Sequence, residues 1–300
     1  MHLFHALILI FLLSACSSFN YDKADSPKPL LAVPSIEPHP KIALVLGSGG
    51  PRGFAHIGVM KVLEESGIEY DLVVGSSVGS LIGAFWSAGY TATEIDELSK
   101  MGDPFTVFDF SLFADRGWIH GQRLQNFVND KLGHRPIESL PRKFIAVATR
   151  IHDKQPIFFN TGNVGVAVRA SSAVSKVFSP VGINGVEYED GDESLPVAVR
   201  AARQAGATFV IAVDVTPFAS SAPANTSPSR IEREVVRRKR VDPELKDADF
   251  VIQPQIGFNT SPTKEFFMKA RLAGETAARE SLPNLQAGIG RDAPNHEIKH

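Results

Sequence analysis

Short apolar runs alternate with segments of helical spacing along most of the chain. The runs are rich in Val, Ile, Leu and Phe and have the length of buried strands. They cover residues 41–47, 70–76, 144–150, 156–162, 207–215 and 249–256. The segments with apolar residues at helical spacing include residues 54–67, 78–89 and 195–206. Apolar strands that alternate with helices predict an α/β fold of three layers (α/β/α), in which helices cover both faces of a mainly parallel central sheet.

The two ends of the chain lack this alternation. Residues 17–40 hold several prolines and little periodic apolar pattern, so they are predicted to form an extended tether that reaches at most roughly 75 Å, at about 3.1 Å per residue. A closing helix is expected over residues 261–280, and residues 283–300 are expected to be a loose tail. A single folded domain is therefore predicted over residues 41–282.

The chain opens with an apolar run, MHLFHALILIFLLSAC, that is too short to span a bilayer comfortably. It ends at Cys16, the one cysteine of the sequence, so no intrachain disulfide can form. Small residues before a Cys, directly after an apolar run, resemble the lipobox of a bacterial lipoprotein signal peptide. The resemblance implies that residues 1–15 are removed and that a lipidated Cys16 begins a tether over residues 16–40, which anchors the protein in a bilayer.

The details of this N-terminus bear on its interpretation. The first residues carry no Lys or Arg, where a positive segment is usual in signal peptides. No Asp follows Cys16, and by resemblance to enterobacterial sorting this favours the outer membrane of a bacterial cell envelope over the inner one. An ordinary cleaved signal, or a membrane anchor with an incidental cysteine, is the alternative interpretation.

Composition and charge exclude some classes of protein. The chain is 43% hydrophobic and 21% charged, which is typical of a globular protein. Its formal net charge of -2 gives no electrostatic reason to expect nucleic acid as a partner. No group of His, Cys and Asp residues has the spacing of metal ligands, so neither a metal nor another cofactor is predicted.

The first candidate for chemistry lies where VVGSSVGSLIGAF joins a predicted strand to a predicted helix. Residues 75–79, GSSVG, fit the pattern G-x-S-x-G, which places a serine nucleophile on a tight strand-to-helix turn. The helix N-terminus beside Ser77 stabilises developing negative charge. Only His296 and His300, at the end of the chain, follow any plausible acid, so the usual order Ser…Asp…His leaves the base unexplained. A glycine-rich helix cap packed into the sheet is the alternative interpretation.

A second glycine-rich turn, GSGGPRG at residues 47–53, also lies between a predicted strand and a predicted helix. Such loops direct several backbone N–H groups at one point, as the binding of an anion or an oxyanion requires. No Gly-Lys-Ser/Thr follows, which excludes a Walker-type phosphate loop, and the glycine spacing fits a dinucleotide fingerprint poorly. Pro51 has no N–H, so the donors are expected from Gly49, Gly50 or Arg52.

A third candidate is Asp190, in the sequence EDGD at residues 189–192, after a short predicted strand. A carboxylate at the end of a strand is well placed to reach a neighbouring loop, although an Asp before Gly also suits an ordinary turn. These three segments, together with ASSAVSKVFSPV at residues 170–181, resemble the patatin-like phospholipase family over roughly residues 41 to 280.

The resemblance implies a Ser–Asp dyad without histidine. Ser77 would be the nucleophile and Asp190 its base, while Gly49, Gly50 and Arg52 would offer the N–H groups of the oxyanion hole. A free Asp, with a pKa of about 3.9, accepts a proton poorly at neutral pH. The site is therefore expected to be partly shielded from water, which raises the pKa of a carboxyl group.

The chain departs from the family pattern at a few positions near these motifs. Ser48 stands where a third Gly is common, and Lys176 stands where a small residue is usual. Asp192 replaces a Gly or Ala after Asp-Gly, and the loop from residue 190 to residue 196 is about two residues short. Asp192 adds a second carboxylate beside Asp190, and none of these departures removes a predicted catalytic group.

Two further segments each allow two interpretations. Residues 104–121, PFTVFDFSLFADRGWIHG, are rich in Phe and either line an acyl pocket or touch a lipid surface, or else simply pack in the core. Residues 230–240, RIEREVVRRKR, are predominantly basic and either dock on anionic head groups or form a solvated helix face, the interpretation that we favour.

The sequence as a whole predicts a serine acyl-ester hydrolase that acts on phospholipid or lysophospholipid at the membrane that holds it. A short-chain carboxylesterase or thioesterase would keep the fold and the nucleophile but not the substrate. A lipoprotein that binds lipid without catalysis is the alternative from another class of protein, although a binding module has no need of Ser77, Asp190 and the glycine loop together.

Overall fold

A computed structural model describes residues 20–101, 108–112 and 114–292. At its centre lies a 9-stranded sheet with the strand order β1-β6-β7-β4-β3-β2-β8-β9, and β5 also pairs with β4. The strands β5 and β7 run antiparallel to β4, and β6 runs antiparallel to β7, whereas the other neighbours are parallel. The strands are β1 (Asn20–Tyr21), β2 (Ile42–Leu46), β3 (Leu72–Ser76), β4 (Lys143–Arg150), β5 (Pro156–Phe159), β6 (Val181–Ile183), β7 (Val186–Asp190), β8 (Phe209–Val213) and β9 (Phe250–Ile252). The mainly parallel sheet that the sequence predicts is confirmed.

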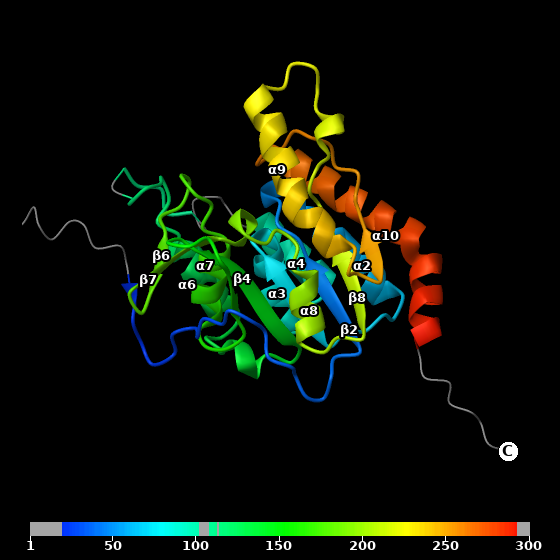
Figure 1. The fold of residues 1–300 in the computed structure, drawn as a ribbon, viewed down its shortest axis with the longest axis horizontal. Helices are drawn as coiled ribbons and strands as arrows, with labels where there is room; N and C mark the ends of the chain where they lie inside the picture. The colour runs from blue at the N-terminus through cyan, green and yellow to red at the C-terminus, as the bar shows by residue number, and fades with distance from the viewer. Residues whose placement is uncertain (1–19, 102–107, 113, 293–300) are drawn as a thin grey trace, which may run out of the picture.

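Helices cover both faces of this sheet (Figure 1). One face is covered by α2 (Phe54–Glu65), α3 (Val78–Ser87), α4 (Ala92–Met101), α6 (Gln122–Lys131), α7 (Val164–Ser171) and α10 (Lys264–Asp292). The other face is covered by α8 (Val199–Gln204) and α9 (Pro228–Leu245). Short 3-10 turns occur at η1 (Gly50–Gly53), η2 (Ile137–Ser139), η3 (Gly191–Glu193) and η4 (Ala219–Ser221). The three-layer α/β/α fold is thus the one that the sequence predicts.

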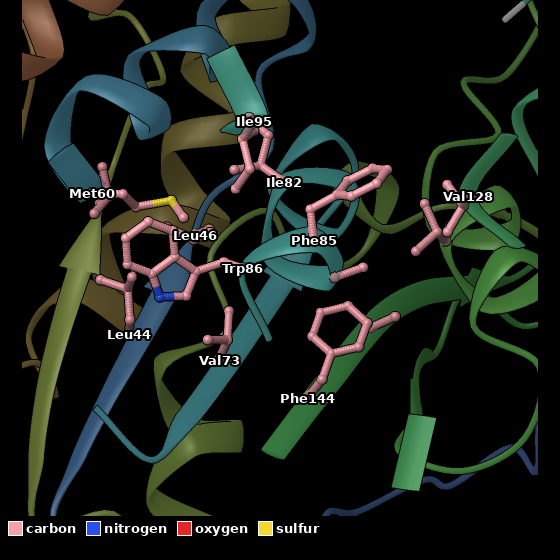
Figure 2. Close-up of a cluster of buried hydrophobic side chains, with 14 of the residues drawn as sticks. Leu44, Leu46, Met60, Val73, Ile82, Phe85, Trp86, Ile95, Val128 and Phe144 are labelled. Atoms are coloured by element: carbon pink, nitrogen blue, oxygen red, sulfur yellow. The ribbon is translucent and has the colours of Figure 1, made fainter. Parts of the chain in front are cut away.

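The core lies on both sides of the sheet because side chains alternate along each strand. In β2, Leu44 and Leu46 belong to the core under α2 and α3, whereas Ala43 and Val45 belong to the core under α8 and α9. Figure 2 shows Leu44 and Leu46 beside Trp86 of α3 on the first of these faces. Since both faces are covered, the central strands are apolar throughout, and this is why they appear in the sequence as continuous apolar runs.

The N-terminal segment differs from the extended tether expected there. Residues 20–40, here called the N-terminal strap, begin with β1, which pairs with β6 in the main sheet. Leu30 and Phe158 exchange backbone hydrogen bonds of 3.0 and 2.9 Å, and the N–H of Ile36 donates to the carbonyl of Ala205 at 3.0 Å. Prolines remove some donors from this segment, but the residues between them still pair with the domain. The folded unit therefore includes the strap. The predicted signal peptide and Cys16 lie outside the described residues.

The C-terminal end also differs from the loose tail predicted from residue 283 onward. The helix α10 continues to Asp292, with Pro283 inside it. Leu285 is 0% exposed, and Leu282 and Ile289 pack against the same core. This apolar spacing of three and four residues continues the buried face of the helix beyond the proline, which explains why the chain stays helical.

None of the helices in the described ranges is long and apolar enough to cross a membrane.

Removal of the N-terminal strap is expected to destabilise the domain. Val33, 5% exposed, belongs to the core on the α8–α9 face, and the strap adds several backbone hydrogen bonds. A chain that begins at residue 41 should therefore lose about 2–4 kcal/mol of unfolding free energy relative to one that begins at residue 20. Urea denaturation of the two chains measures the difference. Equal midpoints would mean that the segment behaves as a tether after all.

Candidate active site

Ser77 lies on a sharp turn between β3 and α3. The strand ends at Ser76 and the helix begins at Val78, and Ser77 between them has φ 54° and ψ −127°. A positive φ is unfavourable for a residue with a side chain, so it persists only where the surroundings hold it. Here the carbonyl of Ser77 accepts hydrogen bonds from the N–H (2.8 Å) and hydroxyl (2.7 Å) of Ser80 and from the hydroxyl of Ser172 (3.2 Å). This is the strand–turn–helix setting in which G-x-S-x-G presents a nucleophile.

Two glycines let neighbouring segments approach this turn closely. A Cβ atom on Gly79 would lie 2.2 Å from the carbonyl oxygen of Leu46 at the end of β2. A Cβ atom on Gly53 would lie 2.2 Å from Cγ1 of Val78. The start of α3 therefore lies directly against the end of β2, and residues 47–53, here called the Gly-rich loop, lie against α3.

Asp190 reaches Ser77 because two strand registers meet on β4. Ser76 at the end of β3 pairs with Val147, and Asp190 at the end of β7 pairs with Ala148. The hydroxyl of Ser77 donates a hydrogen bond to Oδ2 of Asp190 at 2.7 Å. The two residues are 5% and 2% exposed. The structure thus brings together the serine and the carboxylate that the sequence analysis singled out.

The environment of Asp190 favours a strong base. Its pKa is raised from 3.8 to about 8, chiefly because burial disfavours the charged carboxylate and in part because Asp192 is negative nearby. The N–H of Asp192, 2.8 Å from Oδ1, and the hydroxyl of Ser77 oppose this shift by stabilising the carboxylate. A carboxylate with a pKa near 8 accepts a proton far better than a free Asp does.

Other side chains, which no motif of the sequence indicates, hold the pair in place. The hydroxyl of Ser171 accepts a hydrogen bond from the N–H of Ser77 at 3.0 Å and donates to the carbonyl of Val147 at 2.5 Å. The hydroxyl of Thr149 donates to the carbonyl of Asp190 at 2.7 Å. The available signal was the small-residue segment 170–181, but nothing local in it indicates which hydroxyl faces Ser77.

Histidine takes no part in this pair. In the described ranges, Asp190 is the one side chain that accepts a hydrogen bond from the Ser77 hydroxyl. His56 is fully buried with Nε2 2.7 Å from the carbonyl oxygen of Gly47, and burial lowers its pKa to about 4. It is therefore neutral at pH 7 and supports the Gly-rich loop. Within the same described residues, no three His, Cys, Asp or Glu side chains gather as a metal site.

The Gly-rich loop differs in one respect from its expected role. In the described part of the chain, the N–H groups of Gly49 and Gly50 donate to no acceptor, whereas the N–H of Arg52 donates to the carbonyl of Gly49 at 3.2 Å. The guanidinium of Arg52 donates to the carbonyls of Gly257, at 3.3 Å, and Phe258. Arg52 therefore anchors the loop to the chain before α10, and Gly49 and Gly50 are the candidate oxyanion donors.

The basic segment 230–240 lies in α9, and part of it is neither solvated nor available for head groups. Arg237 pairs with Asp192 at 2.6 Å and with Glu234 at 2.6 Å, and its side chain is 15% exposed. Arg238, 12% exposed, pairs with Asp214 at 2.5 Å. The solvated-face interpretation is therefore wrong for these two arginines, because each has a carboxylate partner on the domain.

An exposed apolar surface lies next to the candidate site. It consists of Phe110, Leu112, Trp118, Val174 and Val177, which are 55%, 86%, 62%, 39% and 41% exposed, and is here called the apolar rim. Backbone hydrogen bonds connect its parts, at 2.8 Å from residue 118 to residue 177 and at 2.8 Å from residue 111 to residue 118.

The chain links the apolar rim to the site, because Ala173, which contacts Asp190, directly precedes Val174 of the rim. The carbonyl of Ala173 accepts a hydrogen bond from the N–H of Asp190 at 3.0 Å, and the hydroxyl of Ser172 contacts the carbonyl of Ser77. Within the Phe-rich segment 104–121, Ile119 packs in the core, so that segment is divided between core and surface. Residues 104–107 and 113 of it lie outside the described residues.

Comparison with known proteins assigns the chain to a family. A sequence profile of the patatin-like phospholipases matches residues 44–199, more than half of the chain. The chain belongs to the patatin-like phospholipase family. VipD from Legionella pneumophila shares the fold, with a TM-score of 0.54 at 13% sequence identity over 87% of this chain and 71% of that chain.

Related sequences include longer proteins. An uncharacterized NTE family protein of Mycobacterium bovis is 33% identical over 183 residues, which cover 58% of this chain and 49% of that protein. The lysophospholipase nte1 of Aspergillus fumigatus is 30% identical over 187 residues, which cover 61% of this chain and 12% of that protein. The matched part thus spans about half the length of the first relative and a small part of the second.

Asp190→Asn is expected to stabilise the protein, and more so as the pH rises. Because the folded-state pKa of Asp190 is about 8, the folded protein holds a proton between about pH 4 and pH 8 that the unfolded chain releases. Wild-type stability therefore falls as the pH rises through this window, whereas an amide has no proton to lose. The gain in unfolding free energy should be roughly 2 kcal/mol or more larger at pH 8 than at pH 5. Urea denaturation at both pH values measures it, and a pH-independent gain would contradict the assigned pKa.

Proposed function

We propose that this chain is a serine acyl-ester hydrolase that acts on phospholipid or lysophospholipid through a Ser77–Asp190 dyad. The observation that carries the proposal is the 2.7 Å hydrogen bond from Ser77, on its strained turn, to a buried carboxylate of raised pKa. Nucleophile and base within hydrogen-bonding distance, with the base oriented by a further group, are the mark of an activated nucleophile. The N–H of Asp192 supplies that orienting contact.

In the first step, Oγ of Ser77 would attack the carbonyl carbon of the lipid ester while its proton passes to Oδ2 of Asp190. The oxyanion that forms would be stabilised by the N–H groups of Gly49 and Gly50 and by the N-terminus of α3. As the carbon–oxygen bond to the leaving group breaks, Asp190 would return the proton to that oxygen. The alcohol part of the lipid leaves, and the acyl group stays on Ser77.

In the second step, water would take the place of the alcohol. Asp190 would accept a proton from the water, the resulting hydroxide attacks the acyl carbon, and the same oxyanion donors stabilise the intermediate. When the bond to Ser77 breaks, Asp190 returns the proton to Oγ and a fatty acid leaves. One base therefore serves both steps, which requires it to be ionised at the start of each.

The apolar rim supports a lipid substrate over a small soluble ester. Aromatic and aliphatic side chains that are exposed next to a site provide a surface on which an acyl chain or a lipid aggregate can be held. The family and the fungal relative named as a lysophospholipase support the same choice. A short-chain carboxylesterase or thioesterase, and a lipoprotein that only binds lipid, are the alternatives. The lipid anchor at Cys16, with a location at the outer membrane, stays a prediction.

Ser77→Ala and Asp190→Asn are each expected to abolish the burst of p-nitrophenol from long-chain p-nitrophenyl esters. Loss of the nucleophile prevents acylation, and loss of the base leaves the Ser77 proton without an acceptor, so rates should fall by about a thousandfold or more. The control is Ser66→Ala, which changes a serine at the C-terminal end of α2. If all variants release p-nitrophenol like the wild type, the lipid-binding lipoprotein becomes the better account.

Trp118→Ser is expected to reduce hydrolysis of phospholipid vesicles about tenfold while leaving a short soluble ester unaffected. A fully buried apolar side chain contributes roughly 1.5–3 kcal/mol, and Trp118 would bury its ring only at a lipid surface. The matched control is Leu31→Ser, because Leu31 is 63% exposed on the N-terminal strap. Equal losses on both substrates would argue for the short-chain esterase.

A further inference from the structure

The side chain of Asp192 connects three parts of the chain around the dyad. Its Oδ1 accepts a hydrogen bond from the hydroxyl of Ser48 in the Gly-rich loop. Its Oδ2 accepts hydrogen bonds from Nε (3.0 Å) and Nη2 (2.6 Å) of Arg237 in α9. Its backbone N–H donates to Oδ1 of Asp190 at 2.8 Å. One residue thus contacts the loop with the candidate oxyanion donors, the candidate base and a helix on the outer layer.

The ion pair between Asp192 and Arg237 is largely shielded from water. The two side chains are 18% and 15% exposed. Arg237 also pairs with Glu234 at 2.6 Å, and Arg240 donates to the carbonyl of Asp192 at 3.1 Å. A shielded ion pair is little screened by salt, and removal of one partner leaves an uncompensated charge. Asp192 and Arg237 therefore depend on each other electrostatically.

Ser48 is attached twice to the segment that follows Asp190. It is 0% exposed, its hydroxyl binds Asp192, and its N–H donates to the carbonyl of Pro196 at 2.9 Å. Ser48 directly precedes Gly49, whose N–H is one of the candidate oxyanion donors. The place of the donors relative to the base is thus set in part through Asp192.

We propose that Asp192 and Arg237 are positioning residues for the hydrolysis. Together with Ser48, they hold the Gly-rich loop beside the Ser77–Asp190 pair. Arg237 also balances the charge of Asp192, which lets Asp190 ionise next to it. The inference rests on the function proposed above and adds to it a requirement for α9.

The charges around Asp190 decide the direction of each test. Asp192 and Glu193 of η3 oppose its ionisation, and Arg237 of α9 offsets Asp192. The groups that contact Asp190 from the neighbouring elements are neutral: the hydroxyl of Ser77, the hydroxyl of Thr149 and the carbonyl of Ala173. Among the described residues, further charged groups in this cluster are Arg52, Arg230, Glu234 and Arg240.

The test is the pH dependence of Ser77 labelling by a fluorophosphonate, which needs no natural substrate. Asp192→Asn removes a negative charge. It keeps a side-chain oxygen that can accept from Ser48, and it keeps the backbone N–H that donates to Asp190. The acid limb of the pH profile, where the labelling rate rises as Asp190 ionises, should move to lower pH by roughly 0.5–1 unit in this variant. Arg237→Gln leaves the negative charge of Asp192 unbalanced. The acid limb of the labelling rate of this variant should therefore move to higher pH by a similar amount.

Further variants separate charge from geometry. The double variant Asp192→Asn/Arg237→Gln should return the limb to within about 0.3 unit of the wild type, because neither charge is left. Arg233→Gln, which removes the same charge from an exposed position on α9, should leave the limb in place. Ser48→Ala removes one attachment of the loop but no charge, so the plateau rate should fall roughly tenfold with the limb unmoved.

The outcomes distinguish this inference from the proposed function. If the wild type is labelled and Ser77→Ala is not, but neither charge variant shifts the limb or both shift it the same way, the positioning role is refuted and the dyad stands. If Arg237→Gln does not fold, Arg237→Lys keeps the charge and should lower the plateau alone, while Asp192→Asn still tests the direction. If the wild type is not labelled, the proposed function fails, and a ¹³C NMR titration of the Asp190 carboxyl decides the inference by the same opposite shifts.

Discussion

A carboxylate withdrawn from water is the feature on which the rest of the site depends. Burial makes Asp190 basic, but the same burial disfavours the ionised form that has to accept a proton. The surroundings answer with contacts that favour the charged form: the hydroxyl of Ser77 on Oδ2 and the N–H of Asp192 on Oδ1. The register of β3 and β7 on β4 fixes where these contacts meet. The strand register thus determines where Asp190 lies relative to Ser77, and burial determines the pKa of its carboxyl group.

Charged side chains of alternating sign lie at increasing distance from Asp190. Nearest to the base lies a second carboxylate, Asp192, and behind it lies Arg237 of α9, which is itself shared with Glu234. An isolated charge at either position would be unfavourable, whereas Asp192 and Arg237 together offset each other. The helix α9, which the sequence presents as a basic surface helix, therefore also supplies partly buried arginines that pair with carboxylates of the domain.

The sheet and the turn at Ser77 could be predicted because their signals are local, whereas the pairing of Ser77 with Asp190, 113 positions away, was predicted from the resemblance to the patatin-like family. Strands buried on both faces give continuous apolar runs, and the turn between β3 and α3 requires glycine at particular positions. The N-terminal strap gives no such signal, since isolated backbone hydrogen bonds leave no periodic pattern. Ser48 and Asp192 looked like unrelated departures from the family pattern, because their contact joins residues separated by 144 positions and depends on the tertiary fold. The occupied N–H of Arg52 was equally inaccessible to a sequence argument.

The pairing of β1 with β6 shortens the distance that the N-terminus can span. The chain is fixed from Asn20, so only four peptide links separate that residue from Cys16. An extended chain of this length reaches at most about 14 Å, against roughly 75 Å for a tether that ends at residue 40. If Cys16 carries a lipid, this short link would hold the domain close to the bilayer surface. The orientation of the domain, more than its distance from the membrane, would then decide which lipids can enter the site.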